Sequence, residues 1–450
     1  MQAKRRLLVD IVLENAKILS YGGVTQAAVA IDDGKIAKIS KKTNMPPASR
    51  KMNLEGLLIL PGLIDAHVHL RDQELGYKED FSSGTAAAAN GGVTLVIDMP
   101  NNKPVTMDQS TLRERIAVAE QKSVINVAFY SAFPEKIDEM QSIIQEGAKG
   151  FKLYMSEKIG GQDPDDDEAL LRVSKEAAKS DIPISIHAED RKLLQAALKR
   201  MKGKGNDSID SYLKVHSPEV EVRAIERAIE IAKMSGARIH ICHVSTDRGL
   251  ETICAAKTSG LPVTCEVAPH HLLLSSHHLK DIGPVALTNP PMRSRRSIRS
   301  LWSRLLADFI DILVSDHAPH ARNEKTRLSI WETAAGIAGI ETLLPLMLTQ
   351  VSRKHLPLAL LVKMMSENPA GIFRLEGRGG LSEGNCADLV VVDMKREWEI
   401  DASKFYSKAN FSPFDGWQVK GKPVKTFVNG SLVMDEGEIV AKPGEGMVIR

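Results

Sequence analysis

The sequence is poor in cysteine, and its cysteines are scattered. Cys242, Cys254, Cys265 and Cys386 are the four present. They form no Cys-x-x-Cys pair and no dense framework, which excludes a disulfide scaffold and a cysteine-type zinc site. Unpaired thiols of this kind are typical of a protein kept in a reducing cytoplasm, and we expect that location.

Aromatic residues and an excess of one charge are also lacking. Aromatic residues make up 4% of the chain, and 59 basic residues face 57 acidic ones, for a net charge of +2. This balance gives no general attraction to nucleic acid or to a membrane surface, and no aromatic platform for stacking bases is evident. No run reaches the ~18–20 uninterrupted apolar residues of a membrane helix, and residues 1–6 lack the apolar core of a signal peptide.

What the sequence does have is length and ordinary globular composition. Its 450 residues are 43% hydrophobic and 26% charged. This size suits one large enzyme domain accompanied by something smaller.

The two ends of the chain share a pattern of short strands and turns. Before residue 61, apolar strand-like runs are expected at 7–13, 27–31, 36–39 and 57–60, and after residue 375 at 388–393, 424–428 and 431–434. Asp32-Asp33-Gly34 and Asn429-Gly430 are hairpin signals. We therefore expect residues 1–60 and 376–450 to build one small β-sandwich domain together.

The middle of the chain, residues 61–375, alternates strands and helices. Candidate strands lie at 61–69, 93–99, 124–131, 149–154, 182–187, 237–243, 261–267 and 311–316. Eight strands separated by helical patterns, for example at 220–234 and 341–348, favour an α/β fold of the (β/α)8 TIM-barrel type over an open sheet.

The most informative motif is Asp65-Ala66-His67-Val68-His69, directly after an apolar run. In an extended strand, residues i and i+2 point to the same face. Two imidazoles would then aim at one point from the end of a buried strand, which is a common way to hold a divalent metal.

Other ligand-type residues stand at the ends of other predicted strands. They are Lys152 in the fourth strand, His187 in the fifth, His243 in the sixth and Asp316 in the eighth. One strand-end histidine is more often a hydrogen-bonded core residue, and one lysine is more often a surface residue. Six such residues on five strand ends meet at one face of a barrel, and this joint pattern favours a metal centre.

Lys152 suggests how two metals would be held. An ammonium has no lone pair and repels cations, but a free amine beside metals can add carbon dioxide. The resulting carbamate can bridge two cations ~3.5–4 Å apart, which share and activate a hydroxide. We expect His67 and His69 at the inner metal, His187 and His243 at the outer one, and Asp316 as inner ligand and proton shuttle.

The remaining histidines are not expected to be ligands. His240 has the opposite strand parity from His243, so we expect it to face the helices. His270, His271, His277 and His278 are assigned to loop structure, with His270 a candidate for the mouth of the site. His216, His317 and His355 are left unassigned.

These motifs, together with Gly384-Asn385-Cys386-Ala387-Asp388 near the end, resemble the amidohydrolase superfamily. Arg71 after the histidine pair, Met99-Pro100-Asn101-Asn102, Asn289-Pro290-Pro291-Met292-Arg293 and Asp316-His317-Ala318-Pro319-His320 are similar to the type I dihydroorotases within it. The resemblance spans essentially the whole chain. Departures include Gln73 where a small residue is usual and Asn102 where threonine is common, so the loop after Arg71 is expected to differ.

The resemblance implies substrate-binding residues. Arg71, Asn101 and His320 would hold a substrate carboxylate, and Asn289 and the backbone near Gly339 would contact a ring. An arginine can pair with a carboxylate in a bidentate way, which a neutral ring would not use.

The resulting hypothesis is a zinc-dependent enzyme that interconverts N-carbamoyl-L-aspartate and L-dihydroorotate in pyrimidine biosynthesis. It would use two Zn²⁺ per subunit, bridged by carboxylated Lys152, and a metal-bridging hydroxide whose proton Asp316 carries. Its partner is a small anionic substrate, and a homo-oligomer or association with a transcarbamylase stays open.

Two rival hypotheses remain. One is a related cyclic amidase, an allantoinase or a dihydropyrimidinase, since the segment from Tyr212 to Glu221 is somewhat allantoinase-like. The other is a non-catalytic barrel that scaffolds a partner enzyme. The presence of all six predicted ligands argues against the scaffold.

Overall fold

The computed structural model describes residues 8–20 and 23–450; the predicted strand residue Leu7 and the absence of a signal core in residues 1–6 concern residues outside these ranges. Two sheets organise the described chain. One has eight strands in the order β13-β12-β11-β10-β9-β8-β7-β6, so neighbours in sequence are neighbours in space. All of its pairings are parallel, which confirms the predicted barrel.

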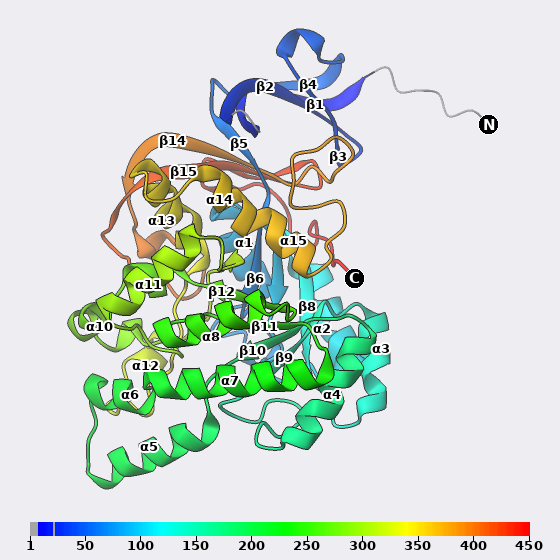
Figure 1. Cartoon of the computed structure of the whole chain (residues 1–450). Coiled ribbons are helices and arrows are strands. Elements are labelled where there is room, and N and C mark those ends of the chain that lie inside the picture. The colour runs from blue at the N-terminus through cyan, green and yellow to red at the C-terminus, as the bar shows by residue number, and fades with distance from the viewer. Residues whose placement is uncertain (1–7, 21–22) are drawn as a thin grey trace.

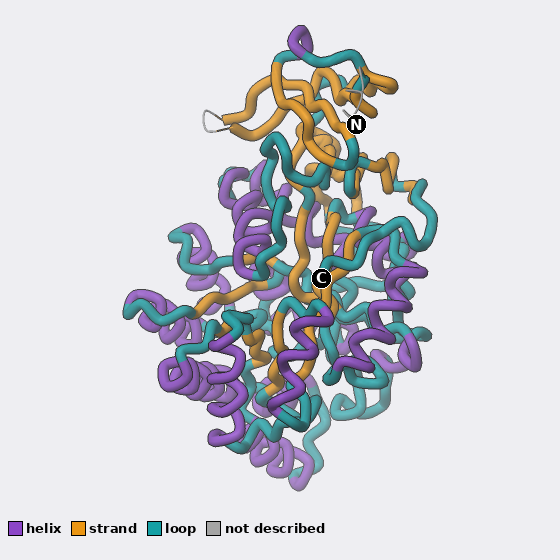
Figure 2. Tube along the Cα trace, turned by 90° about the vertical axis from the view of Figure 1, so that its right-hand side faces the viewer, coloured by secondary structure: helices purple, strands orange, loops and turns teal. Residues whose placement is uncertain are grey.

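Each predicted barrel strand is found. The strands are β6 (Leu63–Val68), β7 (Val93–Asp98), β8 (Asn126–Ala132), β9 (Gly150–Tyr154), β10 (Ile184–His187), β11 (Ile239–Ile241), β12 (Val263–Val267) and β13 (Ile312–Leu313). They form the interior of the larger lobe in Figure 1 and Figure 2, with helices around them.

The helices follow the strands as the 3.6-residue apolar pattern predicts. They are α1 (Phe81–Asn90), α2 (Gln109–Lys122), α3 (Met140–Glu146), α4 (Asp167–Lys179), α5 (Arg191–Gly203), α6 (Ile209–Val215), α7 (Pro218–Ser235), α8 (Asp247–Thr258), α9 (Pro269–Leu273), α10 (Ser276–Ile282), α11 (Arg295–Leu306), α12 (Arg322–Lys325), α13 (Ile340–Ser352), α14 (Leu358–Val362) and α15 (Asn368–Ile372). Within the described ranges, none of them combines the length and apolarity needed to cross a membrane.

The barrel strands are apolar on both faces, as strands buried on both sides must be. Side chains of one parity, such as Ile64, Leu95 and Ile97, fill the interior together with Phe373. Those of the other parity pack under the helices in the main core. This alternation carries polar side chains at the strand ends to one edge of the barrel.

The barrel is joined between its first and last strands by contacts beyond β13. The His69 amide donates to the His317 carbonyl at 2.8 Å. The Ser315 amide donates to the Asp65 carboxylate at 3.2 Å, and burial raises the pKa of Asp65 to about 7. This joint places Asp316 next to the histidine pair.

The second sheet is built from both ends of the chain, as predicted. Its strands are β1 (Val9–Ser20), β2 (Gly23–Asp32), β3 (Lys35–Ser40), β4 (Ala48–Asn53), β5 (Leu58–Pro61), β14 (Leu389–Glu399), β15 (Gln418–Val428), β16 (Ser431–Asp435) and β17 (Glu438–Ile439). In Figure 1 the blue strands β1–β4 stand at the top, and the orange β14 and β15 lie between them and the barrel.

Both hairpin signals form turns. Asp33 and Gly34 have φ of 49° and 72°, and Asn429 and Gly430 have φ of 49° and 80°. Two successive left-handed residues suit the right-handed twist of the strands they join. The last residues leave this sheet: the Ile449 amide donates to the Val127 carbonyl of β8 at 2.8 Å.

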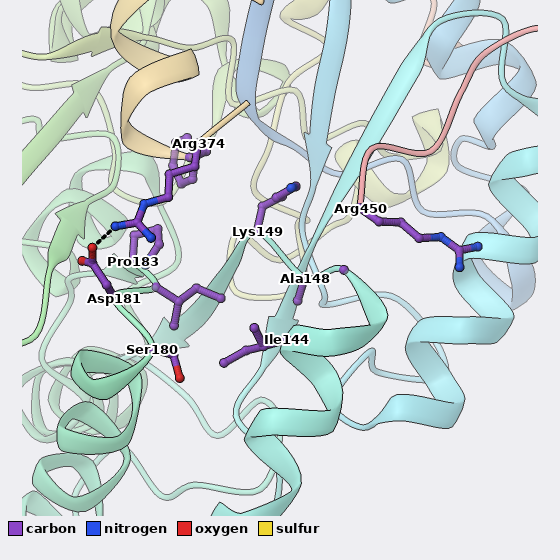
Figure 3. A pocket seen from close by; sticks show the side chains of 11 residues that line it. Ile144, Ala148, Lys149, Ser180, Asp181, Pro183, Arg374 and Arg450 are labelled. Carbon is purple, nitrogen blue, oxygen red and sulfur yellow. Dashed lines mark ion pairs between the residues drawn. The ribbon is translucent and has the colours of Figure 1, made fainter. Parts of the chain in front are cut away.

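One hollow lies away from the strand ends that carry the predicted ligands. It has a volume of about 190 Å³ and lies where β9 and β10 begin, with Lys149, Pro183 and Phe373 among its lining residues. Figure 3 shows Arg374 turned to Asp181 and Arg450 pointing away, so the cationic side chains do not converge. None of the predicted site residues lines this hollow.

Gly62 joins the two sheets at a place with no room for a side chain. A Cβ there would lie 2.2 Å from Thr94 Oγ1 and 2.7 Å from Thr94 Cγ2, so rotation of the threonine gives no relief. We expect Gly62→Ala to lower the free energy of unfolding by about 1–3 kcal/mol through overpacking. Gly203→Ala, where a Cβ meets nothing within 4 Å, is the control and should be neutral or slightly stabilising. Denaturant unfolding of both variants measures the difference.

Candidate metal centre

The first group of site residues lies where the first and last strands of the barrel meet. His67 is the penultimate residue of β6, His69 directly follows that strand, and Asp316 lies three residues after β13. Asp316 Oδ1 lies 3.5 Å from His67 Nε2 and 3.7 Å from His69 Nε2. One ligand atom from each of the three residues lies within 4.8 Å of the others, and all three side chains are buried. The structure therefore brings together the residues predicted for the inner metal.

Both histidines of this group are held by their outer ring nitrogen. His67 Nδ1 donates to Glu266 Oε1, and His69 Nδ1 lies 2.6 Å from Asn101 Oδ1. A histidine that binds a metal usually donates its other N–H to a carboxylate or carbonyl, which fixes the tautomer. The Nε2 atoms that face Asp316 are thus left with their lone pairs.

The second group consists of His187 and His243, and here a carboxylate holds the outer ring nitrogen of His187. His187 ends β10, and its Nε2 lies 3.0 Å from Glu189 Oε2. Its Nδ1 lies 3.1 Å from His243 Nε2. The ring centroids of His67 and His243 are 5.1 Å apart, so the two groups adjoin. The residues predicted for the outer metal also converge.

Lys152 lies within the same cluster. Its side chain is buried, and its Nζ donates to Cys242 Sγ at 2.9 Å. The pKa values of His67, His69 and His243 are lowered first by burial and further by the Lys152 charge, among other neighbours. An ammonium on Lys152 would offer no lone pair to a cation.

The prediction that His240 faces the helices is wrong. His240 Nε2 lies 3.0 Å from Glu266 Oε2, the carboxylate that also holds His67. Strand β11 ends at Ile241, and His243 takes a left-handed backbone conformation with φ of 34°. Strand alternation therefore stops before His243, and parity from the strand cannot relate it to His240.

The cluster fits a pair of divalent cations. Burial lowers the pKa of His67 to about 4 and those of His69 and His243 well below the ordinary value, which keeps these imidazoles neutral. A neutral imidazole with one nitrogen held and the other free is the form that binds a metal. Nitrogen and carboxylate donors of this kind suit zinc.

Comparison with known proteins identifies the family. Residues 58–433 match the amidohydrolase family, and residues 1–59 match the N-terminal domain of the urease alpha-subunit. The chain belongs to the amidohydrolase family. A dihydroorotase of Methanothermobacter thermautotrophicus is 36% identical to it over 440 residues, which is 97% of each chain.

Other relatives of this amidohydrolase carry different names. An L-hydantoinase of Paenarthrobacter aurescens is 34% identical over 98% of each chain, and an allantoinase of Rubrobacter xylanophilus is 34% identical over 96% of each. The solved structure of the L-hydantoinase (dihydropyrimidinase) from Arthrobacter aurescens superposes with a TM-score of 0.94 at 34% identity, covering 98% of this chain and 100% of that one. The predicted resemblance and the prediction of a hydrolase are confirmed.

Two cationic side chains, Arg71 and Lys78, lie beside the candidate metal centre, where Lys78 pairs with Glu324 at 2.9 Å. The Arg71 guanidinium is buried, donates to the Pro319 carbonyl at 3.3 Å and lies 3.5 Å from His320 Nε2. Lys78 Nζ approaches His320 Nδ1 at 3.3 Å. Among residues 8–20 and 23–450, no carboxylate forms an ion pair with Arg71. Two of the three residues predicted to hold a carboxylate, Arg71 and His320, are therefore in contact, whereas Asn101 is engaged with His69.

The loop after the histidine pair is strained at the predicted departure from the family. Arg71, Asp72 and Gln73 have φ of 55°, 53° and 48°, a conformation that non-glycine residues rarely adopt. Asp98 anchors it: it accepts from the Leu70 amide at 2.8 Å and pairs with Arg115 at 2.7 Å. Such strain persists only where surrounding contacts enforce it.

Asn289, one of the residues predicted to contact a ring, borders a cavity of about 310 Å³ together with Ser156 and Glu189. Ala335 lines the same cavity, and its carbonyl oxygen lies 3.0 Å from His320 Nε2. Gly339 precedes α13, and a Cβ there would lie 2.7 Å from the Ser315 carbonyl oxygen. Gly339 thus lets α13 approach the joint beside Asp316.

Sequence reasoning missed the residues that support the ligands. Glu266 lies within β12 and Glu189 lies two residues after His187, and the sequence analysis assigned a role to neither. Both are fully buried carboxylates, and the histidines beside them hold their pKa well below the usual range despite burial. An acidic residue inside or directly after an apolar strand is the signal that could have found them.

Glu266→Gln tests this support. A glutamine offers one acceptor oxygen, so it cannot accept from both His67 and His240. We expect the affinity for the first Zn²⁺ to fall roughly 10- to 100-fold, the usual effect of losing such a partner. Equilibrium dialysis with metal analysis measures it, and Glu226→Gln on the exposed face of α7 is the control. Unchanged affinity in Glu266→Gln would contradict the role.

Proposed function

We propose that this amidohydrolase acts on cyclic amides and interconverts N-carbamoyl-L-aspartate and L-dihydroorotate. The observation that carries the proposal is the buried Arg71 guanidinium beside His320, which has no ion-pair partner among the described residues. A buried charge without a partner is costly, and an anionic substrate group would supply the partner. The dihydroorotase relative, 36% identical over 97% of each chain, supports the same substrate.

We further propose that His67, His69 and Asp316 would hold one Zn²⁺, that His187 and His243 would hold a second, and that carboxylated Lys152 would supply oxygen donors to both. When bound, the pair would activate a water molecule and polarise the amide carbonyl. The protein's own residues would bind the substrate and transfer the proton.

Arg71 and His320 would fix the substrate carboxylate, which orients the ring amide toward Asp316. In the hydrolytic direction a bond forms between the water oxygen and the ring carbonyl carbon, and the ring C–N bond breaks. Asp316 takes the proton of the attacking water and delivers it to the departing nitrogen. Burial raises the pKa of Asp316, which favours this uptake. The synthetic direction reverses each step.

A second candidate function is hydrolysis of a neutral cyclic amide. It is favoured by the cavity beside Asn289, whose walls include Leu194, Val215 and Trp331 and, among the described residues, no lysine or arginine. The relatives named L-hydantoinase and allantoinase fit this alternative.

The deciding experiment compares turnover of L-dihydroorotate, allantoin, dihydrouracil and hydantoin by the purified, zinc-loaded protein. We expect L-dihydroorotate to have the highest kcat/KM. Activity confined to neutral rings would overturn the proposal in favour of the second candidate. A protein that binds no transition metal and is not activated by added zinc would instead favour the non-catalytic scaffold.

Arg71→Ala should mainly raise KM. Loss of a charge-assisted contact of about 1.5–3 kcal/mol predicts a rise of roughly 10- to 150-fold with a smaller change in kcat. Arg113→Ala, which removes an exposed guanidinium paired with Glu146, is the matched control and should leave KM unchanged. Steady-state kinetics with L-dihydroorotate checks both, and an unaltered KM in Arg71→Ala would refute carboxylate binding there.

Asp316→Ala should lower kcat by roughly 10²–10⁴-fold, because it removes the proton carrier. Circular dichroism checks that the variant keeps the fold. Asp281→Ala, on the exposed face of α10, serves as the control for losing an aspartate. Normal turnover by Asp316→Ala would rule out its assigned role.

A further inference from the structure

Two carboxylates in the site share an arrangement. Glu266 lies between His67 and His240, and Glu189 lies between His187 and His216. In each case one histidine is a proposed ligand and the other is not. The distances at Glu189 are 3.0 Å to His187 Nε2 and 2.8 Å to His216 Nδ1.

The two arrangements differ in the surroundings of the histidine that is not a proposed ligand. His240 is fully buried, and its second ring nitrogen lies 2.8 Å from Thr264 Oγ1 on the neighbouring strand β12. His216 lies at the end of α6, its side chain is 12% exposed, and it borders the cavity of about 310 Å³. The Glu266–His240 pair is therefore enclosed within the sheet, whereas the Glu189–His216 pair ends at the mouth of the barrel.

The outer support continues to the residue proposed to contact the ring. The rings of His216 and Tyr212 have centroids 4.4 Å apart. The Tyr212 hydroxyl donates to Asn289 Oδ1 and lies 3.1 Å from the Thr288 carbonyl oxygen. A continuous path of contacts thus runs from His187 through Glu189, His216 and Tyr212 to Asn289.

The path gives a role to the allantoinase-like segment from Tyr212 to Glu221. Glu221, at its end, accepts from the Ser245 and Thr246 amides at 3.0 Å each, two and three residues after His243. Arg293 joins the segment from the other side, donating to the His216 carbonyl and to Ser245 Oγ. The segment therefore supports both proposed ligands of the outer cation.

We propose that His216 and Tyr212 are positioning residues: His216 holds Glu189 so that His187 keeps its Nδ1 free for the outer cation, and Tyr212 holds Asn289. The inference rests on the proposed two-metal centre. It predicts that the affinity for the outer cation depends on the segment from Tyr212 to Glu221, which includes the end of α6.

The physical reason lies in the number of acceptors. A carboxylate can accept one N–H on each oxygen, so Glu189 can fix both imidazoles in one tautomer. If His216 no longer donates, the carboxylate is free to rotate, and His187 loses the partner that keeps its proton on Nε2. A proton on Nδ1 would remove the lone pair that faces His243.

The test is direct binding of Zn²⁺ to the metal-free full-length protein by isothermal titration calorimetry. The variants are His216→Phe, which keeps a ring against Tyr212 but removes the donor, and His216→Gln, which restores an amide donor. We expect His216→Phe to weaken the second Zn²⁺ by roughly 10- to 100-fold with the first unchanged. His216→Gln should recover most of this affinity, and His277→Gln, on the exposed face of α10, should match the wild type.

A second Zn²⁺ bound equally tightly by His216→Phe and the wild type would overturn the inference. So would equal losses in His216→Phe and His216→Gln, because the donor would then be irrelevant. Should His216→Phe unfold, Glu189→Gln tests the same step in a side chain of nearly the same shape. A wild-type protein that binds fewer than two Zn²⁺ would instead contradict the proposed two-metal centre itself.

Tyr212→Phe tests the other end of the path, which is the contact between Tyr212 and Asn289. Loss of the hydroxyl should raise KM for L-dihydroorotate about threefold or more while both Zn²⁺ affinities stay at wild-type values. A change in Zn²⁺ affinity without a change in KM would contradict the role assigned to Tyr212.

Discussion

The site depends on the joint between the first and last strands of the barrel. His69 and His317 share a backbone hydrogen bond, and the Asp65 carboxylate accepts a hydrogen bond from the Ser315 amide. Without this joint, His67 and Asp316 would belong to two unconnected strand ends, 249 residues apart in the chain. The left-handed backbone at Asp316, with φ of 49°, turns its carboxylate toward the histidines and is maintained by the contacts on either side.

Burial shifts the proton affinities of the assembled side chains. It lowers the pKa values of His67 and of the Arg71 guanidinium, and it raises the pKa of Asp316. Each of these states costs stability unless a partner compensates. Glu266 and Glu189 compensate part of it by accepting from two imidazoles each, so the support of the ligands and the stability of the barrel interior rest on the same carboxylates.

The sequence predicts the strands well, because eight apolar runs of strand length alternate with helical patterns and leave few other solutions. The predicted ligands converge because strand ends of a parallel barrel share one edge. The prediction for His240 failed because strand parity was extended through Cys242 to His243, past the last residue of β11. Glu266 and Glu189 were missed because a buried acid is recognisable as a support only when the imidazoles it joins are known to be neighbours.

The mouth of the barrel has two chemically different sides, and this division bears on the range of names among the relatives. Arg71 and Lys78 bring positive charge to one side, where Lys78 pairs with Glu324, whereas the cavity beside Asn289 presents apolar walls and the acids Glu157 and Glu189. The proposed ligands themselves would carry no information about the rest of the ring, since they would act only at the reacting amide. Preference for an anionic or a neutral ring therefore follows from which side offers the better partner, and a buried guanidinium gains far more from a carboxylate than an apolar wall gains from a small ring. The same reasoning explains why the α6 segment matters: it is the element that links the apolar side to a proposed ligand, so changes there can alter substrate preference and cation affinity together.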